Sequence, residues 1–319
     1  DASPGLPITA ILTANRGGNV NWIFDAEWSE WLGLYGTSFH VSSNWASGVV
    51  PGSGSRVLVE TGNPMVISKP VQLLDLTIGG GAAKATVTAN AALTVNENIL
   101  LLTNGTLALN QPSLVRKNLY VLPGGTLTHS ANGSTELYKL DLTVGGDVEI
   151  DVGGAVDATA RGYSGNQGPG TAEGASHGGM GLWYPVHCYG SILAPTNLGS
   201  GGRDNTRGGG AIRINAAGRL LNDGAIRADG TSGPAGGGSG GSIYLTAGTL
   251  AGEGAYSANG GAGAASRVAG GGRMALVATN AGANFDALIL EDLQVKGGTY
   301  PSSPNSSGGS GTIYLQSWY

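Results

Sequence analysis

Gly208-Gly-Gly-Ala211-Ile212-Arg213-Ile214 opens a pattern that recurs three times before the end of the chain. The later copies contain Ser242-Ile243-Tyr244-Leu245, Arg273-Met274-Ala275-Leu276 and Thr312-Ile313-Tyr314-Leu315, at spacings of 31, 31 and 39 residues. An alternating run that directly follows glycine predicts a strand entered through a tight turn. A repeat of this length cannot bury its own apolar face, so the copies must stack on one another.

Shorter repeats of the same kind precede this stretch. Segments 74–80, 99–105, 119–125 and 140–146 recur at spacings of 25, 20 and 21 residues, each with an apolar run before a glycine corner. Second strands are expected at 106–109, 126–129 and 147–150, and in the later repeats at 224–228 and 254–258. Paired strands around glycine corners predict an all-β fold, a right-handed parallel β-helix or β-solenoid.

Four parts are expected along one continuous body. Residues 1–50 form an N-terminal extension and cap, and residues 51–160 form a β-helix with short coils. Residues 161–209 interrupt the repeat as a long insertion, and residues 210–319 form a β-helix with long glycine-rich coils. Because a long insertion in a compact domain is often functional, residues 161–209 are the first candidate region for a site.

The N-terminal part is distinguished by its tryptophans, Trp22, Trp28, Trp31 and Trp45. Residues 25–34 have the spacing of a short amphipathic helix, which predicts a lid over the apolar cross-section of the first coil. The alternative is a sugar-binding platform made by these tryptophans. Residues 6–15 are expected to form a strand without a nearby partner.

Composition narrows the function classes. Glycine accounts for 59 of 319 residues, charged residues make up 12%, and the net charge is -5. A chain without a basic stripe is not expected to bind nucleic acid. The single Cys188 cannot form an intramolecular disulfide, and no apolar run is long enough for a membrane span. The start at Asp1, with no methionine and no signal peptide, favours a processed, exported form.

The loops Ala228-Asp229-Gly-Thr-Ser-Gly and Ala258-Asn259-Gly-Gly-Ala-Gly, within residues 139–315, carry a family resemblance. Together with the Asn44-Trp45 and Pro51-Gly segment that opens the body, they resemble glycine-rich secreted bacterial β-solenoid proteins of the cell surface. The resemblance implies a β-solenoid in an extracellular or cell-surface setting. It carries no activity that can be transferred residue by residue.

Candidate metal ligands are few, and no cofactor is expected. Asp147, Glu149 and Asp151 alternate along a strand and would share one face, which is typical of a solvated surface. Asp229 and Asn259 occupy equivalent places in successive repeats, where stacked oxygens can hold calcium, although an Asx turn explains the same residues. His177, His187 and Cys188 have zinc-ligand chemistry but lack the usual paired spacing.

An enzyme hypothesis assigns the insertion to a polysaccharide lyase or a glycoside hydrolase. A lyase needs a base, an acid and a cation that stabilises the enolate. The candidates are, in that order, His177 or His187, Tyr184 or Tyr189, and Arg203 or Arg207. The alternative is a glycan-binding module that uses Trp183, Tyr184 and Tyr189 without turnover.

The structural hypothesis rests on the last expected strand, which carries Ile313, Leu315 and Trp318. An uncovered last coil exposes apolar side chains and backbone donors to another chain. The expected strand at 6–15, with Ile8, Ile11 and Leu12, can fill that place in a second copy. Such a head-to-tail contact propagates into a filament. We therefore expect an extracellular structural or adhesive solenoid that self-associates end to end, with the carbohydrate enzyme or the glycan-binding module as alternatives.

Overall fold

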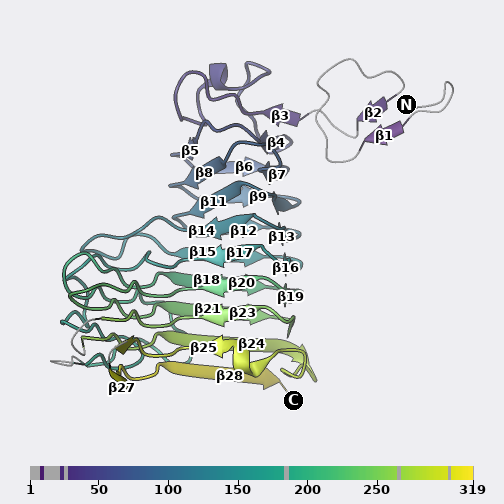
Figure 1. Cartoon of the computed structure of the whole chain (residues 1–319). Coiled ribbons are helices and arrows are strands. Elements are labelled where there is room, and N and C mark those ends of the chain that lie inside the picture. Colours follow the sequence, from purple (N-terminus) through teal and green to yellow (C-terminus); the bar gives the residue numbers. More distant parts are fainter. Residues whose placement is uncertain are drawn as a thin grey trace.

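The protein is a column of stacked coils, seen from the side in Figure 1. The computed structural model describes residues 8–10, 22–24, 28–182, 187–263, 267–300 and 303–318, and for residues 8–10, 22–24 and 303–305 it describes the backbone alone. Three parallel sheets of eight strands run along the column. From β4 onward the chain visits the first, second and third sheets in turn, with few exceptions, and each strand pairs with its equivalent in the next coil.

Each sheet runs strand by strand from the N-terminal end of the column to the C-terminal end. The first sheet contains, in that order, β3 (Trp28–Glu30), β4 (Arg56–Val59), β7 (Asp75–Ile78), β10 (Ile99–Leu101), β13 (Leu119–Val121), β16 (Val148–Ile150), β19 (Arg219–Asn222) and β22 (Thr249–Ala251). The second contains β5 (Met65–Ile67), β8 (Ala85–Ala89), β11 (Gly105–Leu109), β14 (Thr126–Thr128), β17 (Ala155–Asp157), β20 (Ala225–Arg227), β23 (Ala255–Ser257) and β25 (Leu293–Gln294). The third contains β6 (Val71–Leu73), β9 (Leu93–Val95), β12 (Ser113–Val115), β15 (Leu140–Val144), β18 (Ala211–Ala216), β21 (Ser242–Ala247), β24 (Arg273–Ala281) and β28 (Thr312–Trp318).

The remaining elements are short. β1 (Ile8–Ala10) pairs with β2 (Trp22–Phe24) in parallel, and β26 (Thr299–Tyr300) pairs with β27 (Ser303–Ser307) in antiparallel. Two 3-10 turns, η1 (Ser42–Asn44) and η2 (Leu290–Asp292), are the helical elements of the described residues. No helix in that part of the chain is long and apolar enough to span a membrane. The all-β, parallel β-helix expected from the repeats is therefore confirmed.

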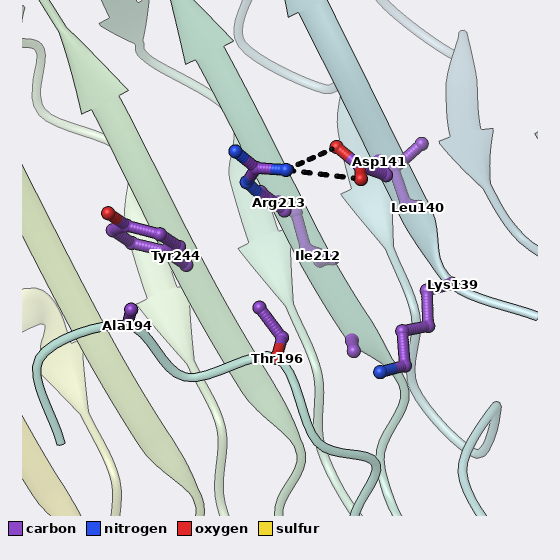
Figure 2. A pocket seen from close by; sticks show the side chains of 9 residues that line it. Lys139, Leu140, Asp141, Ala194, Thr196, Ile212, Arg213 and Tyr244 are labelled. Carbon is purple, nitrogen blue, oxygen red and sulfur yellow. Dashed lines mark hydrogen bonds and ion pairs between the residues drawn. The ribbon is translucent and has the colours of Figure 1, made fainter. Parts of the chain in front are cut away.

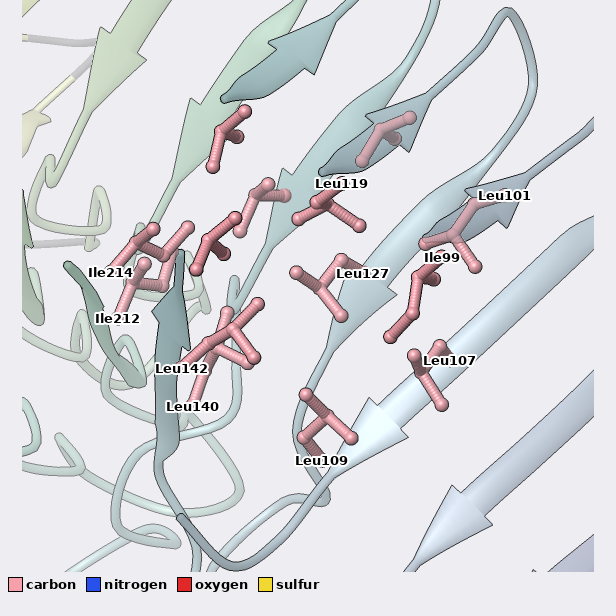
Figure 3. Close-up of a cluster of buried hydrophobic side chains, with 14 of the residues drawn as sticks. Ile99, Leu101, Leu107, Leu109, Leu119, Leu127, Leu140, Leu142, Ile212 and Ile214 are labelled. Atoms are coloured by element: carbon pink, nitrogen blue, oxygen red, sulfur yellow. The ribbon is translucent and has the colours of Figure 1, made fainter. Parts of the chain in front are cut away.

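The core lies inside the column and follows from the alternation of each strand. Ile99 is aligned with Leu76 on one side and with Leu119 on the other, and all three side chains are buried. Figure 3 shows how such rows from the three sheets meet in the interior. Because successive residues of a strand face opposite sides, the intervening residues lie on the outer surface.

The corner between the third and first sheets is held by a ladder of polar side chains. The side-chain oxygen of Asp75 accepts the backbone N–H of Asn98 at 3.0 Å, and Asn98 accepts that of Asn118 at 3.2 Å. Asn118 in turn accepts the N–H of Asp147 at 2.8 Å, and Asp147 that of Arg219 at 2.7 Å. Each side chain satisfies a backbone donor of the next coil, so the corner remains hydrogen-bonded where the strands end.

Most of the expected strands are confirmed. Those at 211–214, 242–245, 273–276 and 312–315 all lie in the third sheet, as β18, β21, β24 and β28. The expected equivalence of segment 140–146 with segment 119–125 is wrong. β15 belongs to the third sheet, and the first-sheet strand that follows β13 is β16. The connection 129–139 lengthens this coil, and both strands precede similar turns, so spacing alone did not distinguish them.

The helix expected at 25–34 is wrong over its described residues. Trp28–Glu30 is the strand β3, which pairs in parallel with β4, and residues 25–27 lie outside the described residues. Trp31 is buried and makes edge-to-face contacts with Trp45, which similarly contacts Phe39. The helical spacing of these aromatic residues therefore reflects packing of a strand and a loop over the end of the column.

Close approach of neighbouring coils at Gly105 provides a test of the stacking. A Cβ atom at this position would lie 2.1 Å from the carbonyl oxygen of Ile78, which belongs to the adjacent coil. We expect Gly105→Ala to lower the free energy of unfolding by about 1–3 kcal/mol, the usual cost of overpacking. Denaturant unfolding followed by circular dichroism measures the change.

Gly54→Ala is the matched control, because nothing lies within 4 Å of the position that its Cβ would take. Its effect is expected to stay within about 0.5 kcal/mol. Equal stability of the two variants would contradict the tight stacking at Gly105.

Candidate functional site

Apart from residues 31–55 at the N-terminal end and residues 282–292 near the C-terminal end, the long connections leave the second sheet and return to the third. They comprise residues 129–139, 158–210, 228–241, 258–272 and 295–311, so the insertion is one member of this set. Figure 1 shows these connections gathered on one side of the C-terminal half of the column. We call this set the glycine layer.

Backbone hydrogen bonds join the successive connections of the glycine layer. Gly209 N–H donates to the carbonyl of Ser239 at 2.9 Å, and Gly240 N–H donates to that of Gly270 at 3.1 Å. A Cβ atom at Gly209 would lie 1.9 Å from the carbonyl oxygen of Ala228. The backbones therefore approach more closely than any side chain permits, which explains the high glycine content.

His177 and Tyr189, both proposed as catalytic, lie together inside this layer. His177 is fully buried, its Nδ1 donates to the carbonyl of Gly240 at 2.8 Å, and its ring lies 4.6 Å from that of Tyr189. The Tyr189 hydroxyl contacts the carbonyl of Leu198 and the hydroxyl of Ser200, each at 2.7 Å. Burial lowers the pKa of His177 to about 4 and raises that of Tyr189. A base buried in this way has no contact with an external polymer, so the geometry does not support His177 as the base of a lyase.

Arg273 belongs to the same cluster, and the sequence did not predict this role for it. Its Nε donates to the carbonyl of Tyr189 at 2.8 Å, and its Nη1 donates to the hydroxyl of Thr312 at 3.0 Å. Burial lowers the pKa of this guanidinium. Arg273 thus ties the insertion to the last two strands of the third sheet.

The other candidates of the insertion lie elsewhere. His187 and Cys188 are exposed, whereas Trp183 and Tyr184 lie outside the described residues. Arg203 pairs with Glu173 at 2.7 Å. Arg207 donates through Nε to the carbonyl of Ala160 at 3.0 Å and through Nη2 to that of Asn132. The structure therefore brings His177 and Tyr189 together, while Arg203 pairs within its own connection and Arg207 reaches the connection 129–139.

The calcium candidates form another ladder. Asp229 accepts the backbone N–H of Asn259 at 2.5 Å and the hydroxyl of Ser257 at 2.7 Å, while Asn259 accepts the N–H of Lys296 at 2.7 Å. Burial raises the pKa of Asp229. A calcium ion at this place would have to displace these protein hydrogen bonds. Among the described residues, no three His, Cys, Asp or Glu side chains are arranged to hold a metal.

A cavity on the third sheet lies outside the column. It has a volume of about 530 Å³ and is bounded by the outer faces of β15, β18 and β21 and by Ala194 and Thr196 of the insertion. Asp141, Arg213 and Tyr244 point outward from these three strands, and Figure 2 shows them side by side. We call this cavity the outer-face groove.

The residues of this groove were not predicted from the sequence, because the candidates were sought in the insertion. A signal was present: Asp141, Arg213 and Tyr244 each stand between two apolar residues, in Leu-Asp-Leu, Ile-Arg-Ile and Ile-Tyr-Leu. The register aligns Asp141 with Arg213 and Arg213 with Tyr244. Equivalent outward positions in consecutive repeats would have identified the row.

Comparison of the chain with protein-family models, with curated proteins and with solved structures finds no match. The function must therefore be inferred from the geometry alone.

Two buried histidines predict that acid destabilises the fold. Burial lowers the pKa of both His129 and His177 to about 4, whereas an unfolded histidine titrates near 6.5. Between these values the unfolded chain binds more protons, so the free energy of unfolding falls as the pH decreases from 6.5 towards 4. Each histidine is expected to contribute a loss of roughly 3 kcal/mol by pH 4. Denaturant titrations at pH 7.5, 6.0 and 5.0 measure this slope.

His177→Asn retains a side-chain N–H for the carbonyl of Gly240 and removes the titrating ring, so its stability is expected to depend less on pH. His187→Asn is the matched control, because it makes the same substitution at an exposed histidine. An unaltered slope in the His177 variant would show that this residue is not a source of the acid sensitivity.

Proposed function

We propose that the chain is an extracellular structural or adhesive β-solenoid that associates end to end with copies of itself. The observation that carries the proposal is that β28 exposes side chains at positions that are buried in the preceding strands of the same sheet. Ile313 is aligned with Met274 and Leu315 with Leu276, and both partners in β24 are completely buried. Yet Ile313 is 40% exposed and Leu315 is 36% exposed. Residues that belong to the interior row therefore face solvent at this end.

The open edge of β28 adds a second attraction for another chain. Among the described residues, β28 pairs with β24 alone, which leaves the other edge of a seven-residue strand unpaired. Trp318, on the same strand, is 59% exposed. An apolar row beside an unpaired strand edge favours extension of the sheet by another strand.

The two ends of the column differ, which favours a head-to-tail contact. The first coil is covered by Trp31, Phe39 and Trp45, all of them buried. The strand pair β1–β2 lies outside the three large sheets, and Figure 1 shows it beside the covered end. We assign this pair as the element that extends β28 of a second copy, because its pairing is also parallel. A contact between two different surfaces does not close, so it builds a filament.

Leu315→Glu tests the assembly surface. A carboxylate at this interior position would be desolvated in the contact, so association is expected to weaken at least tenfold. Sedimentation velocity over a range of protein concentrations, with negative-stain electron microscopy of the same samples, measures the effect. Val152→Glu is the matched control, because Val152 is exposed on the side of the column, away from β28.

Deletion of residues 1–16 tests the other half of the contact and is expected to abolish filaments while leaving the monomer folded. Monomers at all concentrations of the unmodified chain would overturn the proposal. Dimers that do not grow would replace the head-to-tail contact with a symmetric one between two β28 strands.

A further inference from the structure

The outer-face groove is a built cavity that the proposed self-association does not use. Its floor is the third sheet, and Ala194 and Thr196 of the insertion form its wall. Its volume of about 530 Å³ falls within the range of small-molecule sites. A ligand in this groove would therefore bind whether or not the chain assembles.

Strand register arranges the outward side chains of the groove in a straight row. Asp141, Arg213 and Tyr244 line the groove, and the register continues their row beyond it through Ala275, which is completely buried, to Tyr314 on β28. At a strand spacing of about 4.8 Å, the row is roughly 19 Å long. It begins with an ion pair and ends with two tyrosines that stand on either side of the small Ala275.

The charges at the polar end of the row compensate one another. Arg213 Nη1 lies 3.3 Å and 3.2 Å from the two carboxylate oxygens of Asp141. Lys139, which also lines the groove, pairs with Glu136. Two cations and two anions therefore leave no net charge. A strongly anionic ligand such as a phosphate or an acidic polysaccharide gains no general attraction here.

The aromatic end offers flat apolar surface with polar edges. Tyr244 is partly exposed, and its hydroxyl has no hydrogen-bond partner among the described residues. The Tyr314 hydroxyl donates to Gln316 at 3.1 Å, which holds this ring in place. Two coil spacings separate the tyrosines by about 10 Å, comparable to the length of a disaccharide. Tyrosine combines an apolar face with a polar tip and so suits a ligand that carries both kinds of surface.

We propose that the outer-face groove binds a neutral oligosaccharide of hexose units. The C–H faces of its rings pack on Tyr244 and Tyr314, and its hydroxyl groups exchange hydrogen bonds with Asp141 and Arg213. The carboxylate accepts hydrogen bonds and the neighbouring guanidinium donates them. A sugar hydroxyl can do both, so it can bind to this pair. Thr196 adds a hydroxyl from the wall of the groove.

Isothermal titration calorimetry with neutral hexasaccharides of glucose, mannose, galactose and N-acetylglucosamine tests the proposal, with hexagalacturonate as the anionic probe. We expect one of the neutral probes to bind more tightly than the anionic one. Tyr244→Ala is expected to weaken that binding about tenfold, whereas Tyr244→Phe retains most of it. Tyr120→Ala is the matched control, because Tyr120 also faces outward but lies on β13 of the first sheet, and it should leave affinity unchanged.

Tyr314→Ala tests the length of the site: it is expected to weaken binding of the hexasaccharide but not of the corresponding monosaccharide, which is too short to reach from Tyr244 to Tyr314. Thermal unfolding of each variant establishes that the fold is retained. Absence of binding to all neutral probes, preference for hexagalacturonate, or an equal loss in the Tyr120 variant would overturn the proposal.

Discussion

Parallel pairing of each strand with its equivalent in the next coil is the interaction on which the rest of the molecule depends. It fixes equivalent residues at a separation of about 4.8 Å, so whatever occupies one position must tolerate a similar neighbour above and below. Apolar residues satisfy this requirement in the interior, where Leu76, Ile99 and Leu119 form one row. At the corner, Asn98 and Asn118 satisfy the same requirement. Each side-chain amide accepts a hydrogen bond from a backbone N–H of the next coil, and a stack of neutral amides has no charge repulsion.

The glycine layer extends the same constraint to irregular backbone. Apart from the short β26–β27 pair, the described backbone of its connections is mostly irregular, yet N–H and carbonyl groups pair from one connection to the next, as between Gly209 and Ser239. Such pairing requires backbones to meet without intervening side chains, which only glycine allows. Some large side chains of this layer are enclosed by it, and His177 is one of them. His177 and Tyr189 stack on each other there, and Arg273 reaches them from β24. The contacts of these three side chains thus link the insertion to the column.

Periodicity allowed the strands and the stacking to be predicted, because both depend on local alternation and on recurrence. It failed where two segments share the same local pattern. Residues 140–144 and 148–150 both alternate, and only the length of the preceding connection decides which sheet each one joins. The helix expected at 25–34 failed for a related reason, since Trp28 and Trp31 have helical spacing but also fit a strand that ends in a buried loop.

The candidate site was harder to predict than the fold, because residue type alone does not reveal burial. His177 and Tyr189 have suitable chemistry for catalysis, but the glycine layer buries His177 completely and leaves Tyr189 only partly exposed. Asp141 and Arg213 are 72 residues apart in the sequence, and they become neighbours of each other and of Tyr244 only through strand register. Because a long insertion separates equivalent strands, the residues of such a row lie far apart in the sequence, and local spacing does not indicate that they are neighbours.

Register also connects the two proposals. Tyr314 lies on β28, the strand that a second copy would extend, so one end of the sugar-binding row stands about 4.8 Å from the proposed junction. An oligosaccharide that reaches past Tyr314 would contact both copies and bind the assembled state more tightly than the monomer. By linkage, that ligand must then favour assembly by the same free energy. A ligand confined between Asp141 and Tyr244 has no such differential contact. If both proposals hold, the length of the bound sugar decides whether ligand binding and end-to-end association are coupled.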